Sequence, residues 1–259
     1  MLSRFHRLNY SFGWMLAIGA GNAWAETWFQ PSAGTTWQWQ LQGTLNTAYE
    51  VEVYDIDLFD ISTDQIHILQ QQGRKVICYF SAGSVEDWRH DISKISKTAV
   101  GNPLDEWPGE RWLDIRDKSV WRVMQNRLKL AAEKGCDGVE PDNVDAYQNT
   151  SGFNLNAQDQ IKFNRFLAQS AHILNLSIGL KNSLGLIPQL ANDFDFAVNE
   201  QCLEYKECDA LRPFIQQNKA VFHAEYQSRS NLCQYASQHQ FSTLLLPLEL
   251  DGRLRQTCR

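Results

Sequence analysis

Acidic residues follow several short apolar runs of this chain, and they are the residues best suited to chemistry. Asp142 ends one run, within Glu140-Pro141-Asp142-Asn143, and Glu200 ends a later one. Paired carboxylates about 5 to 5.5 Å apart can serve as nucleophile and proton donor in retaining glycoside hydrolysis. Carboxylates at strand ends also cap helices, which explains one or two of them. Acidic residues recur at too many run ends for capping alone, so the pattern favours a reactive site.

Further polar residues accompany this pair at the ends of the same runs. Lys181 is expected to keep Asp142 ionised as the nucleophile, and the longer Glu200 is expected to act as acid/base. The other carboxylates would bind cationic groups of a ligand, and the amide and hydroxyl groups would bind its hydroxyls. These substrate-binding candidates are Asp55, Asp57, Tyr79, Ser81, Glu140, Asn143, Asp145, Lys181, Asn182, Glu225 and Tyr226.

Eight apolar or β-branched runs must position these residues. Several of them, such as residues 76–80 and 244–246, are apolar on both faces, which is typical of parallel strands covered by helices. An exposed antiparallel sheet would instead alternate polar and apolar residues. The expected strands are residues 37–41, 51–58, 75–80, 138–141, 176–180, 194–198, 220–224 and 243–248.

Helical patterns lie between many of these runs. Asp117 can cap a helix that ends at Gly135, and a second apolar stripe runs from Ala157 to Asn175. A third, shorter helix follows Asp64. The first two strands leave no room for a long helix between them, so the first β/α unit is expected to be degenerate.

Removing the first 25 residues from the 259 leaves 234, and eight strands alternating with helices over that length match a single (β/α)8 TIM barrel, whose active site lies at the carboxyl ends of its strands. Adjacent strands are about 4.8 Å apart, so the strands ending near Asp142 and at Glu200 stand about 10 Å apart. Side chains reaching inward would bring the two carboxylates to about 5 Å. An open doubly wound sheet is the alternative, but neither G-x-G-x-x-G nor the P-loop pattern occurs.

The first 25 residues have the pattern of a secretory signal. Arg4 and Arg7 precede an apolar stretch, and Ala23-Trp24-Ala25 fits a cleavage site. A membrane anchor would need about 18 or more apolar residues, and this stretch is shorter. We therefore expect a secreted or periplasmic protein whose single domain spans residues 26–259.

Six cysteines in an exported chain indicate disulfides. Their spacing favours pairing Cys202 with Cys208 and Cys233 with Cys258, which leaves Cys78 for Cys136, although fifteen pairings are possible. A zinc site is the rival, but no C-x-x-C pair occurs. A divalent cation held by Asp55 and Asp57 with Asp60, or by Asp142 with Asp145, is a weaker alternative. We expect neither metal nor cofactor.

Charge and aromatic content narrow the class of ligand. The chain has 24 Lys and Arg against 30 Asp and Glu, a net charge of −6. This balance disfavours nucleic acid and anionic membranes and favours a cationic or neutral partner. Sugar rings stack on aromatic side chains, and Trp88, just after the polar segment 81–84, is the best placed tryptophan.

Five ordered segments together resemble glycoside hydrolase family 114, the endo-α-1,4-polygalactosaminidases. The resemblance runs from about Trp37 to the end of the chain and implies a TIM barrel without a cofactor. It implies that Asp142 and Glu200 are the catalytic pair in retaining, endo-acting cleavage of α-1,4-linked galactosamine chains, including partly deacetylated ones. The segments are residues 76–84, 135–145, 179–182, 199–202 and 224–226.

Two other functions remain open at this point. An exo-acting enzyme similar to α-galactosidases would use a similar pair of acids. A non-catalytic carbohydrate-binding barrel would keep the cleft without turnover, although the intact Asp142 and Glu200 disfavour it. We expect a monomer that binds a cationic or neutral galactosamine polysaccharide.

Overall fold

Eight parallel strands form the centre of the protein in the computed structural model, which describes residues 28–105 and 107–258. The expected signal, residues 1–25, lies outside the described residues. Each predicted run overlaps one strand, so the eight predicted strands are confirmed. They are β1 (Trp37–Gln40), β2 (Val53–Asp57), β3 (Lys75–Ser81), β7 (Gly138–Asp142), β8 (Ser177–Lys181), β9 (Phe196–Glu200), β10 (Val221–Glu225) and β11 (Ser242–Leu245).

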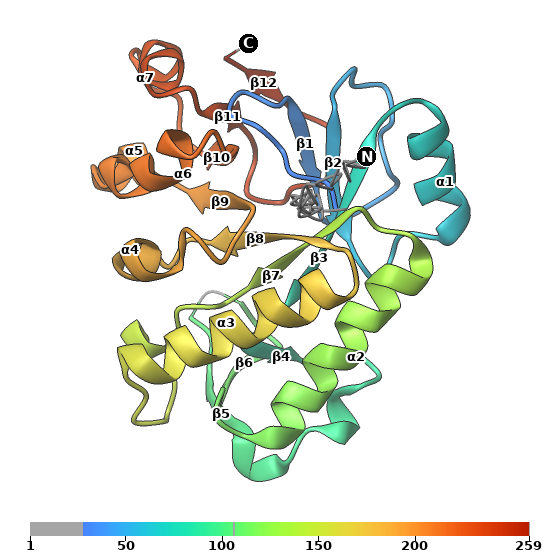
Figure 1. Ribbon diagram of the computed structural model, residues 1–259, viewed down its shortest axis with the longest axis vertical. Helices are drawn as coiled ribbons and strands as arrows, with labels where there is room; N and C mark the ends of the chain where they lie inside the picture. Colours follow the sequence, from blue (N-terminus) through green and yellow to red (C-terminus); the bar gives the residue numbers. More distant parts are fainter. Residues whose placement is uncertain (1–27, 106, 259) are drawn as a thin grey trace, which may run out of the picture.

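Helices cover the outside of this sheet, and Figure 1 shows the long α2 and α3 beside β3, β7 and β8. As predicted, Asp117 caps α2, accepting a hydrogen bond from the Ser119 backbone N–H, and Gly135 ends it in the left-handed conformation. The described segment 41–52 between β1 and β2 contains no helix, which confirms the degenerate first unit. The helices are α1 (Thr63–Gln71), α2 (Lys118–Lys134), α3 (Ala157–Ile173), α4 (Ile187–Leu190), α5 (Cys202–Tyr205), α6 (Arg212–Gln216) and α7 (Leu232–His239).

The short α1 begins slightly earlier than predicted. Ser62 caps it, because the Ser62 hydroxyl accepts from the Gln65 backbone N–H while the Gln65 side chain accepts from the Ser62 backbone N–H. This reciprocal pair satisfies two backbone donors at once and fixes the start of the helix. Among the described helices, no segment is both long and apolar enough to cross a membrane.

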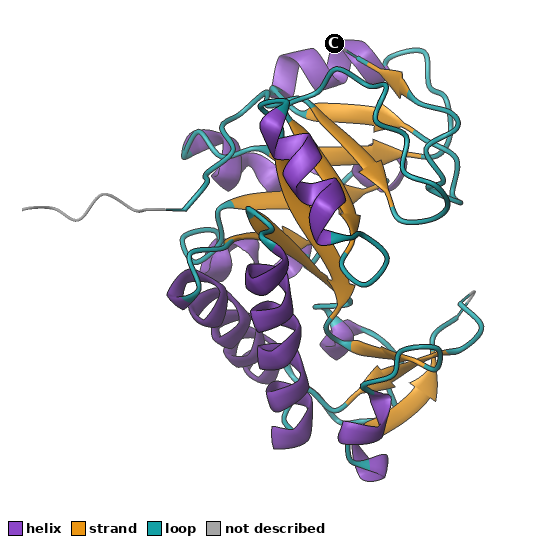
Figure 2. Cartoon of the chain, turned by 90° about the vertical axis from the view of Figure 1, so that its right-hand side faces the viewer, coloured by secondary structure: helices purple, strands orange, loops and turns teal. Residues whose placement is uncertain are grey.

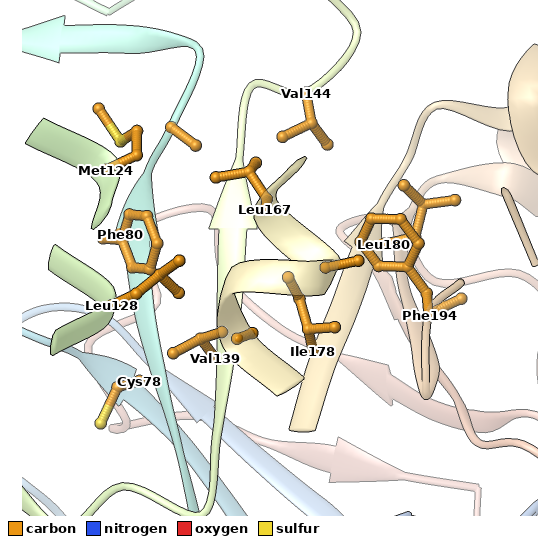
Figure 3. Close-up of a cluster of buried hydrophobic side chains, with 14 of the residues drawn as sticks. Cys78, Phe80, Met124, Leu128, Val139, Val144, Leu167, Ile178, Leu180 and Phe194 are labelled. Atoms are coloured by element: carbon orange, nitrogen blue, oxygen red, sulfur yellow. The ribbon is translucent and has the colours of Figure 1, made fainter. Parts of the chain in front are cut away.

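Two apolar layers hold the sheet, one on each face. The outer layer lies between strands and helices, and Figure 3 shows part of it, with Val139 and Ile178 of the strands packed near Leu128 and Leu167 of the helices. The inner layer fills the space that the strands enclose, with rings such as Trp37, Trp39, Phe196 and Phe222. A β-carbon at Gly179 would lie 2.3 Å from the Phe196 ring. Any side chain at position 179 would therefore clash with that ring, so glycine is required there.

A seam between β1 and β11 completes the circle of strands. In the part of the chain that the structure describes, no backbone ladder joins these two strands. Side chains bridge them instead: the Trp37 indole donates to the Ser242 carbonyl at 2.7 Å, and the Ser242 hydroxyl donates to the Thr35 carbonyl at 2.6 Å. The free edge of β11 pairs with the short antiparallel β12 (Gln256–Thr257), seen at the top of Figure 1.

An inserted sheet between β3 and α2 was not predicted. Its antiparallel strands β4 (Ser84–Glu86), β6 (Glu110–Leu113) and β5 (Val100–Pro103) pair in that order. Figure 2 shows this small sheet projecting from the end of the barrel. Strands of three or four residues are too short to show a clear alternation, which explains why sequence patterns missed them.

Three disulfides follow the preferred pairing. Cys202 bonds Cys208 within one loop, Cys233 bonds Cys258, and Cys78 of β3 bonds Cys136 after α2. The bond to Cys258 ties the segment carrying β12 to α7. The pairing deduced from cysteine spacing is therefore confirmed.

Candidate active site

A cavity of about 1090 Å³ opens at the carboxyl ends of the strands. Barrel strands supply its floor, and the inserted sheet supplies one wall. Most of the predicted site residues line this cavity: Asp57, Tyr79, Trp88, Asp142, Asn143, Asp145, Lys181, Asn182, Glu200 and Tyr226.

Lys181, the last residue of β8, lies at the centre of the site. Its ammonium nitrogen is 3.1 Å from Glu140 Oε1, and 3.3 Å from both Asp142 Oδ2 and Glu200 Oε2. Burial alone would lower the pKa of Lys181, but the three carboxylates, Asp142 foremost, raise it well above its usual range. The side chain therefore stays charged and has one acceptor for each of its three N–H groups.

Asp142, at the end of β7, is surrounded by donors. Its Oδ1 accepts from the Asn143 backbone N–H at 2.7 Å, and its Oδ2 accepts from the Tyr79 hydroxyl at 3.1 Å. Together with Lys181, these donors hold the carboxyl group in one orientation. About 20% of the side chain remains exposed to the cavity. A carboxyl group that is both fixed in position and accessible is suited to nucleophilic attack.

Glu200, at the end of β9, faces the same space. Its Oε1 accepts from the Tyr226 hydroxyl, and its Oε2 accepts from the Asn182 amide at 3.4 Å, while 25% of its side chain is exposed. Asp142 Oδ2 and Glu200 Oε2 contact the same Lys181 nitrogen, so they cannot lie farther apart than the sum of those two contacts. This limit is compatible with the separation of about 5 to 5.5 Å in retaining glycosidases.

Sharp turns follow each of the strands that carry these groups. Asn143, Asn182 and Gln201 have φ of 59°, 44° and 61°, in the left-handed region that asparagine tolerates better than most residues. A β-carbon at Gly83 would lie 1.8 Å from the Asn143 carbonyl oxygen. The loop after β3 thus needs glycine to approach the turn after Asp142.

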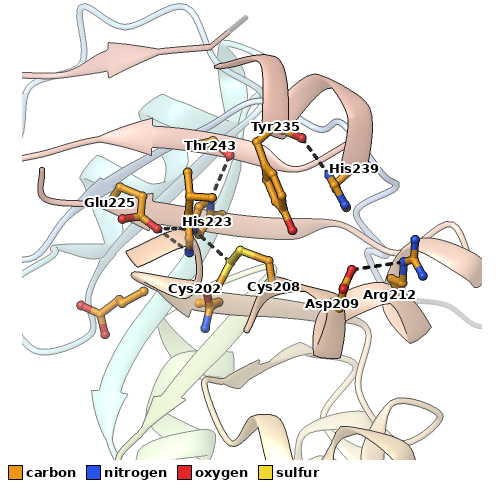
Figure 4. The surroundings of a disulfide bond; sticks show 12 residues. Cys202, Cys208, Asp209, Arg212, His223, Glu225, Tyr235, His239 and Thr243 are labelled. Carbon is orange, nitrogen blue, oxygen red and sulfur yellow. Dashed lines mark hydrogen bonds and ion pairs between the residues drawn. A yellow bond between two sulfur atoms is a disulfide. The ribbon is translucent and has the colours of Figure 1, made fainter. Parts of the chain in front are cut away.

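Glu225 was predicted to bind substrate, but the structure does not bring it to the cavity wall. It is fully buried and accepts from His223 at 3.0 Å (Figure 4). It also accepts from the Leu203 backbone N–H at 2.8 Å. Burial would raise the pKa of Glu225, but the adjacent His223 lowers it. Glu225 therefore fixes the start of α5, two residues after Glu200, instead of reaching a ligand.

Cys202, Cys208 and His223 form a group of possible metal ligands among the described residues. The two sulfur atoms are already bonded to each other in a disulfide, as Figure 4 shows. Zinc binds deprotonated thiols, so this oxidised pair has no thiolate to offer a metal.

Asp55, Ser81 and Glu140 also lie outside the cavity lining, and all three are fully buried. Asp55 precedes Asp57 by two residues, and Glu140 precedes Asp142 by two. Residues two apart point to the same face of a strand, so these carboxylates are one level deeper inside the barrel. Ser81 is covered by the insertion, where its hydroxyl lies 2.5 Å from that of Ser84.

The insertion contributes residues that the sequence did not single out for the site, namely Trp107, Trp112 and Glu110. Trp88 and Trp107 are 55% and 45% exposed, although tryptophan side chains are on average highly buried. Burial raises the pKa of Glu110 to about 7, and Glu86 and Asp142 add to the shift. The clustering of tryptophans outside the strand pattern was the one available signal for this wall.

The cavity is strongly acidic. Its only cationic lining residues among those described, Arg89 and Lys181, are both ion-paired. Its carboxylates outnumber them: Asp57, Asp60, Glu86, Asp105, Glu110, Asp142, Asp145, Glu200 and Glu249. Such a surface attracts cations.

Comparison with known proteins identifies the family of the chain. The sequence model of glycoside-hydrolase family GH114 matches residues 20–259. The chain belongs to this family. As a GH114 member it is a glycoside hydrolase, in agreement with the paired carboxylates at the strand ends, and the resemblance carried by the five sequence segments is confirmed.

Solved structures agree with the GH114 assignment. Ega3 of Aspergillus fumigatus, determined in complex with galactosamine, is 44% identical, with a TM-score of 0.86 over 92% of this chain and 100% of that chain. The glycoside hydrolase domain of PelA from Pseudomonas aeruginosa is 13% identical, with a TM-score of 0.68 over 86% and 98% of the two chains. The PelA likeness concerns the fold alone. No curated protein sequence matches the chain.

Proposed function

We propose that this GH114 member is a retaining, endo-acting hydrolase of α-1,4-linked galactosamine polysaccharide, with Asp142 as nucleophile and Glu200 as acid/base. The observation that carries this proposal is the pair of partly exposed carboxylates joined by Lys181 at the floor of the acidic cavity. Support for the sugar comes from the 44% identical Ega3, which was determined with galactosamine.

The reaction needs two steps at the anomeric carbon. In the first step, an Asp142 oxygen attacks this carbon, the glycosidic C–O bond breaks, and the Glu200 proton passes to the leaving oxygen. In the second step, Glu200 takes a proton from a water molecule whose oxygen attacks the same carbon, and the bond to Asp142 breaks. Lys181, Tyr79 and the Asn143 backbone N–H stabilise Asp142 as it regains its charge.

The cavity fits a long cationic chain. Deacetylated galactosamine carries an ammonium group on each sugar, and the cavity carboxylates complement that charge. Its volume of about 1090 Å³ exceeds the upper end of the range for drug-sized pockets, about 1,000 Å³. Room for several sugars supports cleavage within the chain, and the exposed Trp88 and Trp107 offer faces on which rings can stack.

Amide substitutions at the two acids test the assignment. Asp142→Asn and Glu200→Gln each remove an ionisable group at nearly constant shape, so each is expected to abolish turnover while circular dichroism stays native. Asp209→Asn, the same exchange at a largely exposed surface residue, is the matched control. Turnover near the normal rate in either active-site variant would overturn the assigned roles.

Product analysis separates the competing functions. Incubation with a deacetylated galactosamine polymer is expected to yield short oligosaccharides early, whereas an exo-acting enzyme would release monosaccharide. Binding without products would indicate a carbohydrate-binding barrel. Proton NMR of the first product is expected to show the α-anomer, and the β-anomer would refute the covalent intermediate.

The place of action is part of the proposal. Three disulfides suit an oxidising compartment, which supports an exported enzyme. We propose that residues 1–25 direct export and that residues 26–259 form the working domain. N-terminal sequencing of the exported protein is expected to begin at Glu26.

A further inference from the structure

Beneath Lys181 lies a pair of carboxyl groups that the proposed reaction does not use. Asp55 of β2 and Glu140 of β7 are both completely buried. Glu140 accepts from Lys181 through Oε1 at 3.1 Å, and from the Trp39 indole through Oε2 at 3.0 Å. Each Glu140 oxygen therefore already has a donor, as expected of an ionised carboxylate.

Asp55 has a different environment. Neither of its oxygens has a hydrogen-bond donor among the described residues, and the Glu140 carboxyl is the neighbouring group that interacts with it most strongly. A hydrogen bond between two carboxyl groups requires a proton on one of them. Two adjacent carboxylates in a protein interior cannot both be ionised without a large cost in free energy.

The charges around the pair indicate where the proton resides. Lys181 from β8 contacts Glu140, while Asp142 from β7 is the other charged group near both members. Tyr79 from β3 faces Asp142, and Trp39 from β1 contributes only a neutral donor. Burial raises the pKa of Asp55 well above its usual range and raises that of Glu140 to about 7. Glu140 has the cation, so Asp55 keeps the proton.

We propose that Asp55 and Glu140 form a carboxyl pair that holds one proton and one negative charge, and that this single charge positions Lys181 between Asp142 and Glu200. The inference rests on the proposed function for its kinetic consequence, because it concerns the groups that hold the two reacting acids. Asp55 and Glu140 are positioning residues, since neither reaches the cavity.

This arrangement sets how strongly Lys181 acts on the catalytic acids. With Glu140 ionised, the lysine charge is divided among three carboxylates. Without that anion, the whole lysine charge would act on Asp142 and Glu200 and would attract their negative charge more strongly. Because a general acid must carry a proton, a stronger cation beside Glu200 is expected to reduce activity towards higher pH.

Two neutral substitutions distinguish this proposal from a purely structural role. Glu140→Gln removes the negative charge, so the pH–rate profile is expected to shift to lower pH by at least about one unit. Asp55→Asn replaces a protonated carboxyl with an amide that also donates to Glu140, so it is expected to keep the pH optimum of the wild type. Asp195→Asn, at a buried carboxylate preceding β9 at the opposite end of the barrel, is the control for loss of a buried acid.

The kinetic outcomes decide between the two possibilities. A downward shift in Asp55→Asn equal to that in Glu140→Gln would show that Asp55 is ionised, and would overturn the proposal. An unshifted profile in Glu140→Gln would overturn it as well.

Infrared spectroscopy gives a test that needs neither substrate nor the Glu140 variant. The difference spectrum between the wild type and Asp55→Asn at neutral pH is expected to show the C=O band of one protonated carboxylic acid, sensitive to deuterium exchange. Other protonated carboxyl groups, such as Glu110, contribute to both spectra and cancel. The lack of such a band in the difference spectrum would refute the shared proton. Because this measurement is independent of turnover, failure of the proposed polysaccharide activity would leave it interpretable.

Discussion

Two buried groups of charges lie near the carboxyl ends of the strands, and only one of them is built for chemistry. Lys181 contacts Glu140, Asp142 and Glu200, and two of these carboxylates are 20% to 25% exposed. The second group joins Arg89 and Arg127 to Asp57, Glu86 and Asp91. We refer to these as the lysine cluster and the arginine cluster.

The arginine cluster is closed on itself. Arg127 donates to both Asp91 oxygens at 2.9 Å and to the Ser81 carbonyl at 2.8 Å, while Arg89 donates to Asp57 and Glu86. Planar guanidinium groups satisfy carboxylates two bonds at a time and leave few lone pairs for a ligand. The cluster therefore fastens the inserted sheet to β2, β3 and α2.

The difference shows what distinguishes a reactive site from a structural one made of the same residue types. A lysine offers one compact charge that several carboxylates can share, and their remaining surface stays open to the cavity. Asp57 illustrates the point, since it was predicted to bind substrate but its oxygens are occupied by Arg89 and by the backbone N–H groups of Phe59 and Asp60.

Lys181→Met should give the largest effect, on activity. The substitution removes the charge that Asp142 and Glu200 share, so kcat/KM on galactosamine polymer is expected to fall by about 10² to 10³-fold or more. Steady-state kinetics with reducing-end detection measures the change. Near-normal kcat/KM in the variant would show that the lysine cluster is structural, like the arginine cluster.

Arg127→Met is expected to act on stability instead. Asp91 and Glu86 would be left buried without their partner, which typically costs about 3–5 kcal/mol in the free energy of unfolding. Urea unfolding measures this loss, and the kcat per folded molecule is expected to stay close to that of the wild type. A drop in kcat as large as that of Lys181→Met, with no loss of stability, would show that the arginine cluster also serves catalysis and would contradict the contrast between the two clusters.

Glu110→Gln should have the smallest effect and depend on pH. Glu86 of the arginine cluster and Asp142 of the lysine cluster both add to the burial that raises the pKa of Glu110 to about 7 from 4.5. A raised carboxyl pKa means that folding stability is lost as pH rises from 4.5 to 7, because the folded state disfavours the ionised form.

The Glu110→Gln variant is therefore expected to be more stable than the wild type at pH 8, on the order of 2 kcal/mol, and much less so at pH 5. Urea unfolding at the two pH values measures the difference. An equal effect at both would show that Glu110 does not titrate in this range.

Local sequence patterns were enough to predict most of the fold. The eight strands and the caps of α2 depend on residues close in sequence, while the disulfide pairing follows from the short spacing of two cysteine pairs, which leaves Cys78 for Cys136; all were confirmed. The strand-end position of Asp142 and Glu200 follows from the same patterns, which is why both reach one cavity.

Depth and long-range partners were not predictable in this way. Alternation along a strand shows which face a residue occupies, but not how far along the barrel axis it lies, so Asp55 and Glu140 were placed at the surface of the site. Glu225 was misplaced because it accepts a hydrogen bond from the Leu203 backbone N–H at the start of α5, a partner distant in sequence that no local pattern reveals. The inserted sheet pairs strands too short to be recognised without their neighbours.

The left-handed turns at Asn143, Asn182 and Gln201 have a consequence for how such an enzyme can diversify. Each turn directs the chain away at once from the strand that carries the reacting group. Loops beyond the turns can therefore change in length and sequence without displacing the acids. Changes in these loops can alter which polymer is bound, while Asp142 and Glu200 keep their positions.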